Sequence, residues 1–89
     1  MNIVQWNKLL YMEIYNVQDA NGTLLARITQ TRITQTHIKW RWQIFQVSEP
    51  EYEFKFGIVD TLGSAKMAVE KMLLQHGFRV LSDREKNLL

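Results

Sequence analysis

The chain has 89 residues, a formal net charge of +2 and no cysteine. This length fits one domain, residues 1–89, with 82–89 as a frayed tail, and the lack of cysteine excludes disulfides and thiolate chemistry. Because we find neither a signal-peptide pattern nor about 18 consecutive apolar residues, we expect a cytoplasmic protein without a membrane span.

The first nine residues fit either a helix or a strand edge, and we leave the choice open. An apolar alternation then predicts a strand over 11–19, and Asn21-Gly22 is the preferred pair for a type I′ turn. We therefore expect a hairpin in which 23–29 returns along 11–19. Tight closure would place Val17 near Ala26 and Tyr15 near Ile28.

A tandem repeat follows, Arg-Ile-Thr-Gln-Thr at 27–31 and again at 32–36. Strand faces repeat every two residues, so a period of five would put Ile28 and Ile33 on opposite faces of one strand. We expect the two copies to flank a turn or bulge near 30–32, in an open, protruding connection. A harmless duplication and a mobile basic finger that touches a partner are both consistent with this pattern.

The centre of the predicted fold is a strand that runs from about Ile33 to Val47. Its alternate residues separate into an apolar face and a basic face: Ile38, Trp40, Trp42 and Ile44 against His37, Lys39, Arg41 and Gln43. Two tryptophans on one strand bury a large area, so we expect them to form the layer beneath a covering helix.

Ser48 to Pro50 should end this strand, since proline has no N–H to donate. The alternation of Tyr52, Phe54 and Phe56 with charged residues predicts a returning strand. Keeping the apolar faces together would set Phe54 and Phe56 opposite Trp40 and Trp42. The same register would bring Arg41 or Gln43 beside Glu53 and Lys55.

A helix is predicted over 62–75, with Thr61 as its N-cap and Gly77 as its left-handed C′ residue. Its apolar stripe would pack on the sheet, with Lys66 and Glu70 as an outward pair: Leu62, Ala65, Val69, Met72 and Leu73. Residues 79–81 could add a short strand. The predicted fold is α+β: a twisted antiparallel sheet of about four strands with one main C-terminal helix on one face.

The sequence offers little for catalysis. We expect both histidines, His37 and His76, to be structural or surface residues, and no group of residues has metal-ligand or phosphate-loop spacing. We therefore predict a protein that is not an enzyme and has no cofactor or metal.

The surface with a case for binding is the basic sheet face. No acidic residue occurs between Asp19 and Glu49, so the middle of the chain carries a local positive charge. The candidate partner-binding or nucleic-acid-binding residues are Arg27, Arg32, His37, Lys39, Arg41 and Lys55. Against DNA, Glu51 and Glu53 would enter the same face and offset part of that charge.

Two resemblances bear on function. The stretch Gly57-Ile-Val-Asp-Thr61, followed by a helix opening near Ala65-Lys66, resembles the strand-strand-strand-helix pattern of AP2-type and integrase arm-binding DNA domains over roughly 39–72. The chain departs from that pattern in its N-terminal hairpin, its acidic Glu51 and Glu53, and its long repeat-bearing loop. It also resembles small orphan phage and prophage proteins, including anti-CRISPR proteins, which implies a modulator of a host protein.

We therefore expect a non-enzymatic binding protein that occupies a surface of a partner macromolecule, as a phage-encoded inhibitor of a host defence complex would. A protein is the favoured partner, and the alternative is a sheet-type DNA-binding protein. Met67 and Leu74 lie off the predicted core stripe. If they form an exposed apolar patch, they favour a homodimer or a partner surface.

Overall fold

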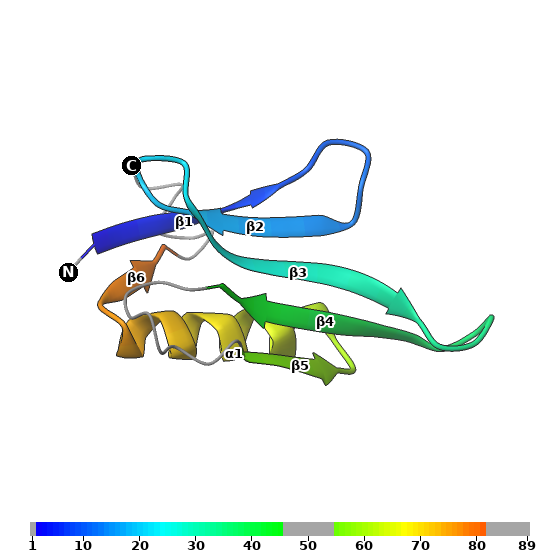
Figure 1. The fold of residues 1–89 in the computed structure, drawn as a ribbon. Coiled ribbons are helices and arrows are strands. Elements are labelled where there is room, and N and C mark those ends of the chain that lie inside the picture. Colours follow the sequence, from blue (N-terminus) through cyan, green and yellow to red (C-terminus); the bar gives the residue numbers. More distant parts are fainter. Residues whose placement is uncertain (1, 46–54, 82–89) are drawn as a thin grey trace.

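The computed structural model describes residues 2–45 and 55–81. Its elements are, in chain order, β1 (Asn2–Lys8), β2 (Ile14–Gln18), β3 (Leu24–Arg32), β4 (Ile38–Ile44), β5 (Lys55–Val59), α1 (Leu62–Gln75) and β6 (Phe78–Val80). The six strands form one sheet in the order β5-β4-β3-β2-β1-β6 (Figure 1). The α+β class is confirmed, but the sheet is larger than the four strands predicted.

The sheet is mixed rather than wholly antiparallel. β1 pairs antiparallel with β2 and parallel with β6. Directly after β6, the Leu81 N–H donates to the Val4 carbonyl of β1 at 2.9 Å. The N-terminal stretch is thus a strand, the second of the two alternatives left open. β6 can be parallel to β1 because the chain reaches it through α1, a crossover of the kind that parallel pairing requires.

The helix was predicted correctly at both ends. The Thr61 hydroxyl accepts the Ser64 N–H at 3.1 Å, and Gly77 has φ 87°, which suits a left-handed C′ residue. Its buried residues are Ala65, Val69 and Leu73. Because α1 contacts β3, β4 and β5 as well as β6 at the other edge, the sheet curls around it (Figure 1).

Lys66 and Glu70 do not form the outward pair predicted. The Trp6 indole N–H donates to the Glu70 carboxylate at 2.9 Å. The Lys66 ammonium lies 5.7 Å from the centre of the Trp6 ring and 5.1 Å from that of Tyr15. Both helix side chains therefore connect α1 to β1 and β2. They interact with the aromatic side chains of these strands instead of forming an outward pair.

The core lies between the helix and one face of the sheet. A cross-strand row of buried side chains runs through it: Trp6, Val17, Ala26 and Ile44. Trp40 and Trp42 pack against this core on the helix side, as predicted, but both are only half-buried. Trp6, at 8% exposure, is the most deeply buried tryptophan.

The first hairpin has the predicted register and a different turn. Val17 pairs with Ala26 and Tyr15 with Ile28. Only Gly22 has positive φ, at 84°, so the turn is not type I′, which needs two such residues. Instead the Asp19 carboxylate accepts the N–H groups of Asn21 and Thr23, both at 2.9 Å, and this side chain holds the alternative turn.

The repeat does not turn where predicted. β3 continues through the first copy to Arg32, and the bend falls at residues 33–36, within the second copy. The Thr34 hydroxyl accepts the His37 N–H at 2.9 Å, so a side chain closes this bend without glycine or proline. The connection protrudes, as predicted (Figure 1), and the central strand is shorter than predicted because the bend occupies its first residues.

The register of β4 and β5 differs from the prediction. Trp42 pairs with Gly57, while Gln43 pairs with Phe56 and Arg41 with Ile58. Phe56 therefore faces away from the helix and is 56% exposed. The reason is steric: a Cβ on residue 57 would come within 2.6 Å of the Trp42 indole, so the glycine lies beneath the ring.

Several predictions lie outside the described residues. They concern the turn at 48–50, Tyr52 and Phe54, the acidic Glu51 and Glu53, and the tail 82–89.

Candidate functional site

The candidate site is the sheet face opposite α1, here called the open face. Cross-strand pairing brings alternate residues of β2 to β5 together on it: Asn16, Arg27, Thr29, Lys39, Arg41, Gln43, Phe56 and Ile58. None of the described strands contains aspartate or glutamate. The charged residues among these are therefore all cations, and apolar side chains lie along the β5 side of the face.

Arg41 is the central cation of the open face. Its guanidinium carbon lies 5.1 Å from the centre of the Phe56 ring, within cation–π range. Its Nε atom is buried and has no hydrogen-bond partner among the described residues. Arg41 is therefore held against an aromatic ring, and an anionic group from outside the chain would meet its terminal nitrogens rather than the buried Nε.

Arg27 is fixed in a different way. Its Nε donates to the side-chain oxygen of Asn16 at 2.9 Å, and Asn16 itself is only 5% exposed. Arg27 pairs with Gln43, two residues from Arg41 on β4, so the two arginines are diagonal neighbours. Such positions are about 7 Å apart, close enough to contact adjacent anionic groups.

Lys39 lies on the same face but is already paired. Its ammonium donates to the Asp60 carboxylate, and this contact holds the pKa of Asp60 below its usual range. The pair neutralises one charge at this end of the open face. Lys39 is thus a weaker candidate for an external anion than Arg27 or Arg41.

Of the remaining predicted site residues, Arg32 and His37 do not join this cluster. Arg32 pairs with Ile38, and this pair lies on the opposite face from the neighbouring pair of Thr31 and Lys39. The predicted place of Arg32 on the open face was therefore wrong. His37 lies at the end of the exposed bend that links β3 and β4. Lys55 pairs with Ile44, and its side chain is outside the described part of the chain.

Sequence reasoning missed Phe56, which supplies the exposed ring of the site. The available signal was Gly57, because only a residue without a Cβ fits under the indole of Trp42. Placing this glycine opposite a tryptophan would have turned Phe56 outward.

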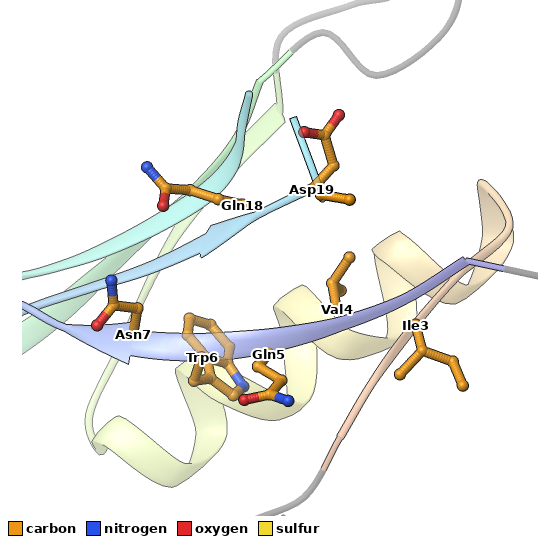
Figure 2. A pocket seen from close by; sticks show the side chains of 8 residues that line it. Ile3, Val4, Gln5, Trp6, Asn7, Gln18 and Asp19 are labelled. Carbon is orange, nitrogen blue, oxygen red and sulfur yellow. The ribbon is translucent and has the colours of Figure 1, made fainter. Parts of the chain in front are cut away.

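A hollow of about 410 Å³ lies elsewhere, between β1 and the β2–β3 turn (Figure 2). Its lining residues are Ile3, Val4, Gln5, Trp6, Asn7, Gln18, Asp19 and Ala20. Of these only Asp19 ionises, and one of its oxygens already accepts two backbone N–H groups of the turn. The hollow presents amide groups without a nucleophile, and it suggests no reaction.

Within residues 2–45 and 55–81, no three His, Asp or Glu side chains gather closely enough to hold a metal ion. With 14 residues, α1 is too short to cross a membrane. No protein-family model, curated protein or solved structure matches this chain.

Proposed function

We propose that this chain is a non-enzymatic binding protein that occupies an acidic surface of a partner macromolecule with its open face. The observation that carries the proposal is Arg41, held over Phe56 with no anionic partner among the described residues. A guanidinium fixed in this way is prepared for a carboxylate or a phosphate, because less side-chain freedom is lost on binding.

A protein is the first candidate partner. Phe56 and Ile58, 56% and 52% exposed, lie beside Arg41, and aromatic residues with arginine are enriched where proteins bind one another. The resemblance to phage and prophage modulators makes a host protein, such as a component of a defence complex, the partner class we propose.

DNA is the second candidate, and a different observation favours it. The described strands carry arginine and lysine on the open face but no aspartate or glutamate, and Asp60, which follows β5, is already paired with Lys39. A sheet that curls away from its open face, with a protruding β3–β4 hairpin (Figure 1), could also enter a major groove.

The test compares Arg41→Glu with Lys71→Glu, because Lys71 is exposed on α1 and the charge change is the same. Affinity purification from the native host, read by mass spectrometry, should yield a partner with the wild type and Lys71→Glu but not with Arg41→Glu. A partner retained equally by all three chains would show that the open face is not the binding surface.

Titration with random duplex DNA at low salt separates the two candidates. If DNA is the partner, log affinity should fall linearly with log salt, and Arg41→Ala should reduce the slope by about one unit. The control Lys71→Ala should leave the slope unchanged. No binding by folded wild type at roughly tens of micromolar would eliminate DNA and leave the protein candidate.

A further inference from the structure

The second surface of interest is the outer edge of β5. This strand ends the sheet order, and only β4 pairs with it among the described residues. Exposed edges usually carry lysine, proline or a bulge that discourages pairing with another strand. β5 has one lysine, Lys55, at its first position, whereas the remaining run Phe56-Gly57-Ile58-Val59 has no lysine, proline or bulge. Phe56 and Ile58 are more than half exposed.

We propose that two copies of this chain pair antiparallel through β5, about a two-fold axis at Gly57. In this register Phe56 lies opposite Ile58 of the second copy, and Ile58 lies opposite its Phe56. Directly opposite residues of an antiparallel pair project to the same face. The pairing therefore places the exposed apolar side chains of the two copies side by side on the open face, where they contact one another.

The edge is complementary to itself on the helix side as well. Gly57 would face Gly57 of the second copy, and on each copy the Trp42 indole already lies over that glycine. The two half-buried rings would continue one aromatic layer across the new interface. An unrelated segment would need a small residue at this position to fit as closely.

The charges of the two copies do not oppose this pairing. Lys55 would lie opposite Val59 of the second copy, so no cation meets a cation within the paired strands. The Arg41 residues belong to the next strand on each side and would be three strand spacings apart, about 14 Å. At physiological salt this exceeds the Debye length of about 8 Å, so their repulsion is largely screened.

Sedimentation of the wild type over a concentration series tests the dimer. The mass should rise from 10.6 kDa towards twice that value. Ile58→Lys would place two ammonium groups in the apolar contact and should weaken the dimer by about tenfold or more. Ile3→Lys is the matched control, because Ile3 is 61% exposed on β1, four strands away from β5 in the sheet order. It should not alter the association.

Cross-linking tests the register. The chain has no cysteine, so thiols can be introduced singly at Phe56→Cys and Ile58→Cys. Opposite Cα atoms of an antiparallel pair are about 4.5–5.5 Å apart, within disulfide range. A mixture of the two variants should therefore oxidise to the mixed disulfide in preference to either homodimer.

This inference does not depend on the proposed function, since association needs no other macromolecule. A wild type that stays monomeric throughout the concentration series would overturn it. A dimer that survives Ile58→Lys, or one without preference for the mixed disulfide, would place the interface elsewhere and would overturn it equally.

Discussion

Replacing Gly57 with alanine tests the register on which the open face depends. A Cβ at this position would lie 2.6 Å from Cε2 and Nε1 of Trp42 and 2.7 Å from Cζ2. Ordinary contacts begin at 3.4 Å, so the indole would have to retreat by about 0.8 Å. The ring is packed against the core on its inner side, which limits that movement.

Two opposing effects set the magnitude. Forcing an extra methyl group into a packed contact costs about 1–3 kcal/mol. Alanine recovers about 0.5–1 kcal/mol, because glycine in a strand loses more backbone freedom on folding. We therefore expect a net loss of about 1–2 kcal/mol. In a domain of this size each kcal/mol lowers the melting temperature by about 4–8 °C.

Chemical and thermal denaturation, followed by circular dichroism, measure this loss. Trp42→Leu removes most of the ring, so Gly57→Ala should cost less in that background than in the wild type. If Gly57→Ala leaves the wild type equally or more stable, the ring does not lie over residue 57. The outward position of Phe56 would then be wrong as well.

Three further substitutions follow from the same geometry. Gly77→Ala should destabilise the chain by about 1 kcal/mol, because φ is 87° there although nothing obstructs a Cβ. Gly63→Ala should stabilise it by about 0.5–1 kcal/mol, since the added Cβ meets no atom in the first turn of α1; both are read by urea denaturation. Lys39 lowers the pKa of Asp60. The stabilisation from this contact is present above the usual carboxyl pKa and is lost as pH falls through the lowered pKa of Asp60. The difference in melting temperature between wild type and Asp60→Asn should therefore shrink below about pH 4.

Local signals in the sequence were sufficient for some elements. The helix was predicted residue by residue because Thr61 and Gly77 mark its ends and its apolar residues recur at helical spacing. The first hairpin was predicted in register because both strands alternate and a short loop joins them. Its turn type was missed because the Asp19 side chain, rather than the Asn21-Gly22 pair alone, determines the turn.

Other features depend on long-range contacts that alternation does not specify. Alternation alone allows a register in which the aromatic residues of the β5 region face the tryptophans. Only the contact between Gly57 and Trp42 selects the register that is observed. That single choice decides whether Phe56 is core or surface. It also determines the candidate site, since an inward Phe56 would leave Arg41 without its ring.

β1 shows the same limit, because its periodicity is ambiguous and its partner β6 is more than seventy residues away along the chain. The pairing with β6 and the insertion of Trp6 beneath α1 were therefore not visible in the sequence.

The last prediction concerns the ranking of two tryptophans. Trp6 is 8% exposed and donates a hydrogen bond to Glu70, whereas Trp42 is only half-buried. Trp6→Ala should therefore cost about 3–5 kcal/mol, enough to unfold a marginal domain, and Trp42→Ala should cost less.

Trp6→Phe isolates the polar part of this effect. It keeps an aromatic ring but removes the donor, so we expect a loss of about 1–2 kcal/mol, some of it from the reduced ring volume. Glu70→Gln keeps an acceptor for the indole and should cost less than Trp6→Phe. Circular dichroism in urea ranks the four variants without relying on tryptophan emission. If Trp42→Ala proves the more damaging alanine substitution, β1 is peripheral and the fold is centred on β4 after all. If Trp6→Ala is the more damaging substitution, the N-terminal strand is an integral part of the core.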